Sequence, residues 1–555
     1  MSAKFGRKIS KVSLVESLKE DMGMPKRAAV VFIGIVISLL LLAAIPRLLY
    51  RPQENGNEST DLLNESRALG ELIIGIEYVV EGLGEHLVDL GIPAVKPLPE
   101  TFSWDKMQKE PGRPIDFTIT DNYVREFQGN GFTHLVLGLR VAGLDLFKTP
   151  WMIDDRYPNS QAVDPDYQPL YREWVRSIVE RYDMDGIDDM PGLKHPVIHY
   201  EIGVEFSSYQ PEPTELYLDT LELGYHAAHN ASDDVIVGHS AFLLTPVFRD
   251  DPGPGEYEEA FELYSEGTAG KGLADIRMVL DRPDIFDFVN VHNLGWPYEI
   301  ERIVRWVDYE LALRDYSKPI IISDTVPTSF AGFGPATRCE GEKLAILLPP
   351  AAEGDRCRLA DYFNRLISGD LEHLAWVFKF LAADIAQRVV IAAEQGIALI
   401  DTAFAGDIPG ANLAIFQAAA GNSGWSGLVE YRSKLGGGLV VTGRRPAFYS
   451  LQQVQEMIGG YTSVERFGNG DLRLYRFEKP GETVIVAWHG YQKLYLPGDG
   501  LPSQVYQLDV VGGQVTLETL RTSPDVDRRT VESVDGKLEL ELTPEPIYIV
   551  VKDKP

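Results

Sequence analysis

The sequence predicts an α/β protein: a (β/α)8 TIM barrel, followed by a C-terminal all-β sandwich and preceded by a single transmembrane helix. Short apolar runs alternate with amphipathic stretches from about residue 70 to about residue 400. Apolar and polar residues alternate after about residue 455, and residues 28–45 carry no charge. A chain of 555 residues is also too long for one ordinary core. The predicted segments are a basic cytoplasmic segment, a signal anchor, a linker, the barrel and the sandwich: 1–27, 28–50, 51–65, 66–455 and 456–555.

The charge of the N-terminal segment predicts how the chain is oriented in a membrane. Residues 1–50 hold eight Lys and Arg against three Asp and Glu, whereas the rest of the chain has a net charge of −35. Residues 28–50 are long enough to cross the lipid bilayer, since about 20 residues suffice. Seven basic residues precede this span, which predicts a cytoplasmic N-terminus and an extracytoplasmic bulk. The alternative is a cleaved signal peptide. We therefore expect a single-pass protein of the cell membrane.

Eight apolar runs in the middle of the chain are the predicted barrel strands. They are apolar almost throughout, as expected for parallel strands buried on both faces. Eight β-α units over this length are typical of a (β/α)8 barrel, and the structural alternative is a doubly wound sheet. The runs are Leu72–Ile76, Ala94–Leu98, His134–Val141, Val197–Gly203, Val235–His239, Phe286–His292, Pro319–Ser323 and Gly396–Ile400.

Apolar residues at spacings of three and four predict helices between these runs. One such helix contains Trp174 and Ile178, another follows Thr214 as a candidate N-cap, and a third contains Val377 and Leu381. After residue 455, Leu538 to Leu542 alternate with glutamates, and tight-turn dipeptides such as Asp535-Gly536 and Gly512-Gly513 appear. This pattern is typical of a β-sandwich.

The two cysteines, Cys339 and Cys357, lie in one loop-like stretch. In an exported domain this spacing predicts a disulfide, and two free thiols are the alternative. Neither cysteine has a Cys or His at ligand spacing, so we expect no metal site there.

No cofactor motif is present in the sequence. The formal net charge of −30 argues against a nucleic-acid partner.

Polar side chains follow the predicted strands, where a (β/α)8 barrel places its active site. A charged residue after one strand is usually a solvated loop residue or a helix cap, but nine of them form a candidate site. They are Lys96, Arg140, Glu201, Glu205, His239, His292, Asn293, Asp324 and Asp401.

Two of these segments resemble motifs of the clan A retaining glycoside hydrolases, a (β/α)8 group that includes β-xylosidase-like and endoglucanase-like enzymes. Tyr200–Phe206 (YEIGVEF) is similar to the strand-four motif whose last Glu is the acid/base, here Glu205. Lys318–Asp324 (KPIIISD) is similar to the strand-seven motif that ends in the nucleophile, here Asp324. The stretches 286–292, 445–449 and 544–548 are similar to other parts of the same family. The resemblance implies glycoside hydrolysis by these two carboxyl groups.

Four positions depart from the family pattern. Val204 stands where the family has an Asn that binds the sugar 2-hydroxyl, and Asp324 stands where it has Glu. Lys96 stands where many members have Arg, and Asn293 stands where an aromatic residue is common. The shorter Asp324 draws its carboxylate back by about 1.5 Å, which affects a mechanism that needs the carboxyl groups about 5–5.5 Å apart.

Aromatic residues in the loops after the strands are candidates for stacking on sugar rings, although such residues also pack the barrel rim. They are Trp151, Tyr209, Trp296, Tyr298, Phe330 and Trp425.

The combined hypothesis is a membrane-anchored extracytoplasmic glycoside hydrolase. It would act on a polysaccharide or glycoconjugate through Glu205 and Asp324, with Glu201 able to tune its neighbour. One alternative is a catalytically inactive barrel that binds glycan or a partner protein at the cell surface. Another barrel hydrolase or a structural envelope component is the third possibility.

Overall fold

The computed structural model describes most of the chain after residue 70. The described residues are 71–143, 149–157, 160–206, 210–245, 247–267, 271–325, 339–340, 354–407, 424–434, 438–510 and 514–552. The predicted basic segment, membrane span and linker lie outside these residues, so the membrane span stays a prediction. Within the described part, no helix has the length and apolar character needed to span a bilayer.

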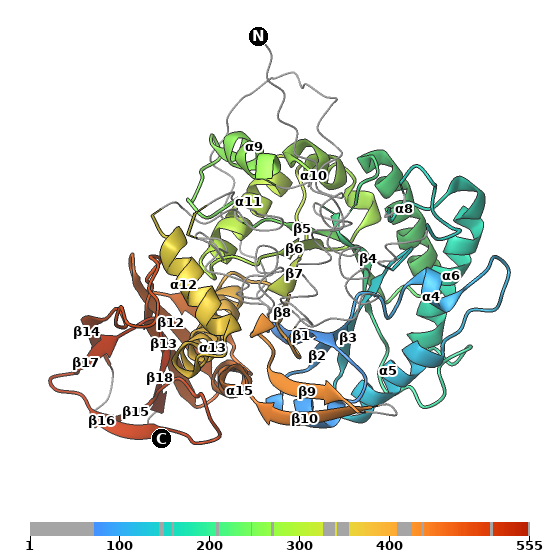
Figure 1. Ribbon diagram of the computed structural model, residues 1–555. Helices are drawn as coiled ribbons and strands as arrows, with labels where there is room; N and C mark the ends of the chain where they lie inside the picture. The colour runs from blue at the N-terminus through green and yellow to red at the C-terminus, as the bar shows by residue number, and fades with distance from the viewer. Residues whose placement is uncertain are drawn as a thin grey trace, which may run out of the picture.

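Eight parallel strands close into a barrel in chain order (Figure 1). Each strand overlaps one of the eight apolar runs, so the predicted barrel is confirmed and the doubly wound sheet is excluded. The strands are β1 (Ile73–Val79), β2 (Ala94–Pro97), β3 (His134–Leu139), β4 (His199–Glu205), β5 (Ile236–Leu243), β6 (Val289–His292), β7 (Ile320–Thr325) and β8 (Leu399–Phe404).

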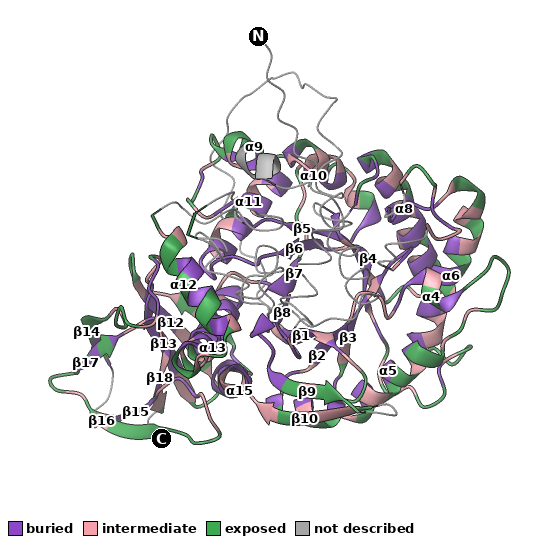
Figure 2. Ribbon diagram, in the orientation of Figure 1, coloured by how far each residue is buried: buried purple, intermediate pink, exposed green. Residues whose placement is uncertain are grey.

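Helices surround the barrel, with their apolar faces turned inward and their polar faces exposed (Figure 2). The described helices are α3 (Gly84–Leu87), α4 (Trp104–Met107), α5 (Thr118–Gly129), α6 (Gln168–Tyr182), α8 (Thr214–Ala231), α9 (Tyr257–Gly267), α10 (Leu273–Leu280), α11 (Glu299–Ala312), α12 (Arg356–Ile367), α13 (Leu371–Glu394) and α15 (Pro446–Ile458).

The predicted N-cap of α8 is wrong. Pro213 occupies the N-cap position, and its side chain makes no capping hydrogen bond with the backbone of the helix. Thr214 is the first helical residue, and its hydroxyl donates to Asp275 Oδ1 at 2.5 Å, which joins α8 to α10.

The barrel interior is filled by stacked layers of side chains, as in other (β/α)8 barrels. The lowest layer is apolar and contains Ile73, Ala94, Val136, Ile236, Phe288, Ile321 and Leu399. Two residues further along the strands, the inward-facing positions are small or polar: Gly75, Lys96, Gly138, Glu201, Gly238, Asn290, Ser323 and Asp401. The glycines leave room for their neighbours, since a Cβ on Gly75 would lie 2.1 Å from Asp401 Oδ1.

The C-terminal region is β-rich, as predicted. A six-stranded antiparallel sheet has one face covered by a two-stranded sheet, and a separate hairpin precedes α15. The hairpin is β9 (Val429–Ser433) and β10 (Leu439–Arg444). The large sheet contains β11 (Ser463–Arg466), β12 (Leu472–Lys479), β13 (Glu482–His489), β18 (Ile547–Lys552), β15 (Gln514–Glu518) and β16 (Arg528–Glu532), and the small one β14 (Gln504–Asp509) and β17 (Lys537–Leu542).

Two turns were expected in this region. The Asp535-Gly536 turn before β17 has φ values of 53° and 74°. Gly512-Gly513 lies outside the described residues.

The β domain docks on the barrel through buried polar contacts. Trp488 Nε1 donates to the Tyr298 hydroxyl at 3.1 Å, and that hydroxyl donates to Gln387 Oε1 at 3.2 Å. Glu301 of α11 pairs with Arg466 at 3.2 Å and with Arg473 at 2.5 Å. These contacts fix the β domain against helices α11 and α13 on the outside of the barrel.

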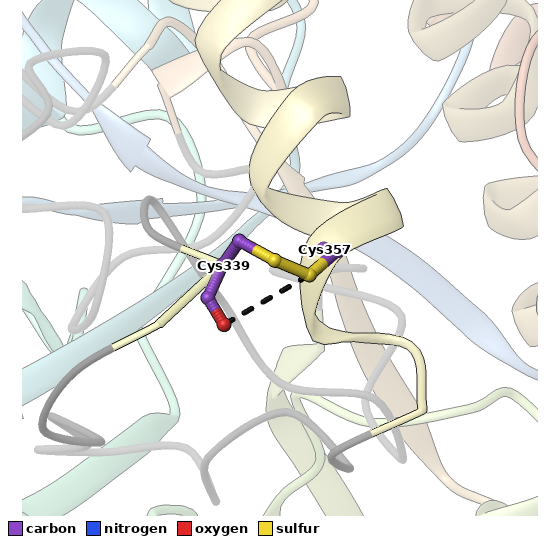
Figure 3. The surroundings of a disulfide bond; sticks show 2 residues. All are labelled: Cys339 and Cys357. Atoms are coloured by element: carbon purple, nitrogen blue, oxygen red, sulfur yellow. Dashed lines mark hydrogen bonds between the residues drawn. A yellow bond between two sulfur atoms is a disulfide. The ribbon is translucent and has the colours of Figure 1, made fainter.

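Cys339 and Cys357 form a disulfide next to the start of α12 (Figure 3). The disulfide prediction is therefore confirmed, and neither cysteine is a free thiol.

Candidate active site

Three buried side chains converge at the ends of β4, β6 and β7. Glu205, His292 and Asp324 each place one nitrogen or oxygen atom within 4.8 Å of the other two. His292 Nδ1 lies 2.7 Å from Glu205 Oε1 and 3.9 Å from Asp324 Oδ2. One oxygen of each carboxyl group therefore lies within 4.8 Å of the other, and retaining glycosidases use two carboxyl groups about 5–5.5 Å apart.

Irregular strand geometry places both carboxylates. The β4–β5 register shifts between Ile202 and Glu205, and Gly203 lies between them with φ 98°. A Cβ at this glycine would approach Gln210 Nε2 to 2.9 Å, so only glycine fits. The β6–β7 register also shifts, and this shift pairs His292 with Asp324. Bulges of this kind re-aim side chains at active sites.

A chain of hydrogen bonds fixes the protonation state of Glu205. Asn290 Nδ2 donates to the His239 carbonyl at 3.4 Å, so its Oδ1 accepts from the Ser323 hydroxyl at 2.8 Å. Ser323 Oγ then accepts from His292 Nε2 at 3.1 Å. Because burial lowers the pKa of His292 to about 4, the ring is neutral at pH 7 and its Nδ1 carries no proton. Nδ1 must therefore accept the 2.7 Å hydrogen bond from Glu205. The chain holds a proton on the Glu205 carboxyl group.

The pKa shifts agree with this assignment. Burial raises the pKa of Glu205 to about 7, although the charges of Lys96 and Arg140 oppose the rise. Burial also lowers the pKa of His292 to about 4, so its imidazole is neutral at pH 7. A neutral imidazole beside a protonated carboxyl group is the arrangement of a general acid.

The raised pKa of Glu205 predicts how kcat/KM depends on pH above neutrality. Because the raised pKa of Glu205 favours its protonated form, a proton donor is present below about pH 7 and is lost as the pH rises above it. We expect kcat/KM for any substrate with a poor leaving group to fall about tenfold per pH unit above that value. Replacing Ser323 with Ala frees the His292 tautomer and should shift this limb to lower pH, which a pH–rate profile of both proteins measures. An identical limb in the Ser323→Ala protein would contradict the chain.

Beneath the two carboxylates, Lys96 joins several strands. Its Nζ lies 2.9 Å from Glu201 Oε2, 3.9 Å from Glu77 Oε2 and 3.0 Å from the Ser323 carbonyl oxygen. Burial lowers the pKa of Lys96, but the charges of Glu201 and Glu77 outweigh burial and raise it. Lys96 is therefore a buried cation that holds β2, β4 and β7 together.

Glu77 is a site residue that the sequence analysis missed. It is 3% exposed, and its side chain forms a hydrogen bond with Asp324. Burial, followed by the Asp324 charge, raises the pKa of Glu77 well above its usual value, so Glu77 is the proton donor in this bond. The available signal was its place directly after the apolar run 72–76.

Asp401 lies in the polar layer with no exposed surface, and neither of its carboxyl oxygens accepts a hydrogen bond within the described structure. Burial raises its pKa to about 8, against an ordinary value near 3.9. Folding therefore takes up a proton, and stability is lost as the pH rises from about 4 towards 8.

Replacing Asp401 with Asn should remove that loss. We expect the Asp401→Asn protein to gain about 2–4 kcal/mol in the free energy of unfolding at pH 7, with little change at pH 4. Calorimetric Tm values across this range measure the effect, and Asp233→Asn on the exposed surface is the matched control. An equal response of the two variants at pH 7 would contradict the burial of an uncharged carboxyl group.

The remaining predicted polar residues differ in where they lie. Arg140 is buried at the rim, where its Nη1 donates to Glu100 Oε1 at 3.4 Å. His239 lies between strands and helices, with its ring stacked on Phe242 at 4.2 Å. Its Nδ1 is 2.8 Å from the Ser240 carbonyl oxygen, and its Nε2 accepts from a backbone amide, so the ring is directed away from the site.

Asn293 is held in a buried network around Arg388, a residue that the sequence analysis also missed. Arg388 comes from α13 and has no exposed surface. It donates to Asn293 Oδ1 at 2.8 Å and to Thr325 Oγ1 at 2.6 Å. Because these residues directly follow His292 and Asp324, Arg388 positions the ends of β6 and β7 without joining the site.

The predicted aromatic residues are mostly packed. Trp151 contacts Trp104 with ring centroids 5.1 Å apart, and the Trp425 carbonyl accepts from Arg445. Trp296 is 7% exposed and its amide donates to Glu299, while Tyr298 faces the β domain. Tyr209 and Phe330 lie outside the described residues.

Among the residues that the structure describes, two groups have the ligand types that could hold a metal ion. One is Glu205, His292 and Asp324, and the other is Asp183, Asp185 and Asp189 after α6.

Comparison with known proteins places the fold. The sequence matches no family model and no curated protein. Among solved structures, the chain is similar to a glucosidase from Croceicoccus marinus, with 12% identity, a TM-score of 0.50, and 88% of this chain and 97% of the other covered.

Two further structures show weaker likeness. An α-L-arabinofuranosidase from Thermotoga petrophila has 11% identity, a TM-score of 0.49, and coverage of 87% and 96%. A β-xylosidase from Caulobacter crescentus has 11% identity, a TM-score of 0.46, and coverage of 88% and 97%.

Proposed function

Since the chain has the (β/α)8 fold of the clan A glycoside hydrolases, we propose that it hydrolyses an extracytoplasmic polysaccharide or glycoconjugate with retention of configuration. The observation that carries the proposal is the convergence of Glu205 and Asp324, with one oxygen of each carboxyl group within 4.8 Å of the other and Glu205 hydrogen-bonded to His292. A proton donor and an anion that face each other across one bond are the equipment of retaining hydrolysis.

The first step would use each carboxyl group once. Glu205 gives its proton to the leaving glycosidic oxygen while Asp324 attacks the anomeric carbon, which forms a covalent glycosyl-enzyme. As the proton leaves, Glu205 becomes a carboxylate, and the neighbouring charges of Lys96 and Arg140 stabilise it.

The second step would reverse the role of Glu205. It takes a proton from a water molecule that attacks the anomeric carbon, and the sugar leaves Asp324. The proton taken from this water restores the protonated form of Glu205, which again donates to His292 Nδ1.

The proposed location is the outer face of the cell membrane. The uncharged span 28–45 and the basic residues that precede it support a single-pass anchor with a cytoplasmic N-terminus. The disulfide supports an oxidising compartment for the barrel.

Turnover of aryl glycosides by the full-length chain tests the proposal. A panel of nitrophenyl glucosides, xylosides and arabinofuranosides should include at least one substrate that releases nitrophenol. Steady-state release should fall in Glu205→Gln, because the second step lacks its general base, and should be kept in Glu215→Gln, an exposed control on α8. Binding of glycan without turnover of any substrate would favour the alternative of a catalytically inactive glycan-binding barrel. Val204 and Asp324, which differ from the residues of the family motif, are consistent with that alternative.

A further inference from the structure

A cavity of about 230 Å³, here called the junction cavity, lies where helix α13 meets the C-terminal β domain (Figure 1). This volume is about eight times the roughly 30 Å³ of a water molecule, which is enough for one sugar ring but not for a helix. Ligand sites occur preferentially at domain interfaces of this kind. The lining residues that matter here are Trp376, Lys379, Phe380, Tyr495, Leu501 and Glu545.

Aromatic rings form one wall of the junction cavity. The ring of Trp376 stacks on that of Phe380, with centroids 5.2 Å apart and an interplanar angle of 9°. Tyr495 of the β domain meets both rings edge-on, at 5.8 Å and 6.3 Å. Trp376 nevertheless remains partly exposed. Such rings offer a large, rigid apolar surface, which suits the C–H face of a sugar.

The charges beside these rings are paired. Lys379 Nζ lies 2.7 Å from Glu545 Oε1 at the exposed edge of the cavity. Asp384, which lines an adjoining smaller cavity, is paired with Arg388. Because each pair is neutral as a whole, the cavity favours a neutral ligand over a charged one.

The pair of Lys379 and Glu545 also selects for polar groups on that ligand. An ammonium group has three protons and a carboxylate has two acceptor oxygens, so the pair has further hydrogen bonds to offer to hydroxyl groups. A purely apolar molecule would take water from these atoms without replacing its hydrogen bonds, which is costly. A neutral ring with both C–H faces and hydroxyl groups, which is a sugar, matches the cavity best.

The junction cavity lies outside the catalytic centre but on the same side of the barrel. Arg388 on α13 contacts Asn293 and Thr325 at the ends of β6 and β7. Trp376 precedes Arg388 by twelve residues on this helix, which places it about 18 Å away along the helix axis. Because α13 leads into the start of β8, its first turns extend beyond the carboxyl ends of the strands.

The aromatic lining continues from the junction cavity towards the catalytic centre. A second cavity of about 10 Å³, with room for about one water molecule, shares Phe380 and Tyr495 with it and is also lined by Trp296. Trp296 follows His292 by four residues, which span at most about 14 Å. A glycan held in the junction cavity is therefore within a few sugar rings of the two catalytic carboxyl groups.

Resting on the proposed glycosidase function, we propose that the junction cavity is a second glycan-binding site, which holds one neutral ring of a long glycan while the catalytic centre acts on another. The site would increase the affinity for long chains and take no part in the chemical step. The preferred substrate is then a neutral polysaccharide or long oligosaccharide, not a small glycoside.

Binding and kinetics of the full-length chain test the inference. Neutral hexasaccharides of glucose, xylose, mannose and arabinose are titrated by calorimetry in the Glu205→Gln background, with hexagalacturonate and the chitosan hexamer as charged comparators. Trp376→Ala should weaken binding of the tightest neutral hexasaccharide about tenfold or more, and Lys379→Ala about threefold. With Glu205 intact, the ratio of kcat/KM for that hexasaccharide to kcat/KM for a nitrophenyl monosaccharide should fall by the same factors, through KM.

The matched control is Glu372→Gln, an exposed change on the same helix outside the cavity lining, which should keep both the affinity and the ratio. Thermal unfolding curves confirm that each variant is folded. Because the Lys379 side chain is half-exposed, Lys379→Ala keeps the test decisive if Trp376→Ala does not fold.

The outcomes separate this inference from the proposed function. Turnover of aryl glycosides, with the same hexasaccharide affinity in the control and in both cavity variants, overturns the inference and leaves the glycosidase proposal. Hexasaccharide binding that falls in the cavity variants, without turnover of any substrate by the wild type, supports the second site and contradicts the glycosidase proposal. Tighter binding of a charged hexasaccharide, or binding of the apolar dye ANS and of no hexasaccharide, overturns the inference.

Discussion

A protein in which Asp324 is replaced by Asn is expected to lose turnover by about ten-thousandfold or more, because an amide cannot form the covalent glycosyl intermediate. The carboxylate lies 3.9 Å from His292 and is buried, so no neighbouring water replaces it easily. Steady-state kinetics measure the loss. Mass spectrometry of protein quenched during turnover should show one added glycosyl unit on the wild type and none on Asp324→Asn.

The matched control for this prediction is Asp233→Asn on the exposed surface, which should keep full activity. Asp324→Glu restores the side-chain length of the resembled family and should keep part of the activity, because its carboxylate still faces Glu205. Activity of Asp324→Asn within about tenfold of the wild type would remove Asp324 as the nucleophile.

The second large effect is expected for Glu205→Gln, and it should depend on the leaving group. Without the proton donor, hydrolysis of substrates with poor leaving groups should fall about a hundredfold to ten-thousandfold. Formation of the glycosyl-enzyme from dinitrophenyl glycosides should hardly change, because dinitrophenolate leaves without a proton. Pre-steady-state burst kinetics with both substrate types separate this step from the second one.

Azide provides an independent readout for Glu205. As a small anion it attacks the glycosyl-enzyme without a general base, so it should restore turnover of Glu205→Gln and yield a glycosyl azide of retained configuration. An equal rate loss for good and poor leaving groups, with no response to azide, would show that Glu205 is not the acid/base.

The barrel was predictable because its strands are buried on both faces, and continuous apolar runs report such burial directly. The hairpin of β9 and β10 was not predicted, because it is half-exposed and carries no such run. Helix α15 crosses the predicted boundary at residue 455, since it packs against α13 of the barrel although β strands follow it.

The site was predictable only where a polar residue ends an apolar run. Glu205, His292 and Asp324 satisfy this condition, and the structure brings them together. His239 satisfies it too, but Gly238 holds the inward-facing position in β5, so the next residue faces outward.

Other site residues depend on contacts that no local pattern encodes. Ser323 and Asn290 act through a hydrogen-bond chain between β6 and β7, and Arg388 reaches the site from a helix that begins 47 residues after Asp324 in the chain. Such roles arise from strand register and long-range packing, which appear only when the barrel closes.

The docking of the β domain sets a condition on how the molecule matures. Glu301 on α11 pairs with Arg466 and Arg473, which follow it by 165 and 172 residues in the chain. Trp488, the partner of Tyr298, follows that residue by 190 residues. During synthesis, the barrel therefore remains incomplete at the helix that follows β6 until nearly the whole protein has emerged. A chain terminated before residue 466 would lack all three partners, and this flank of the barrel would then stay uncovered.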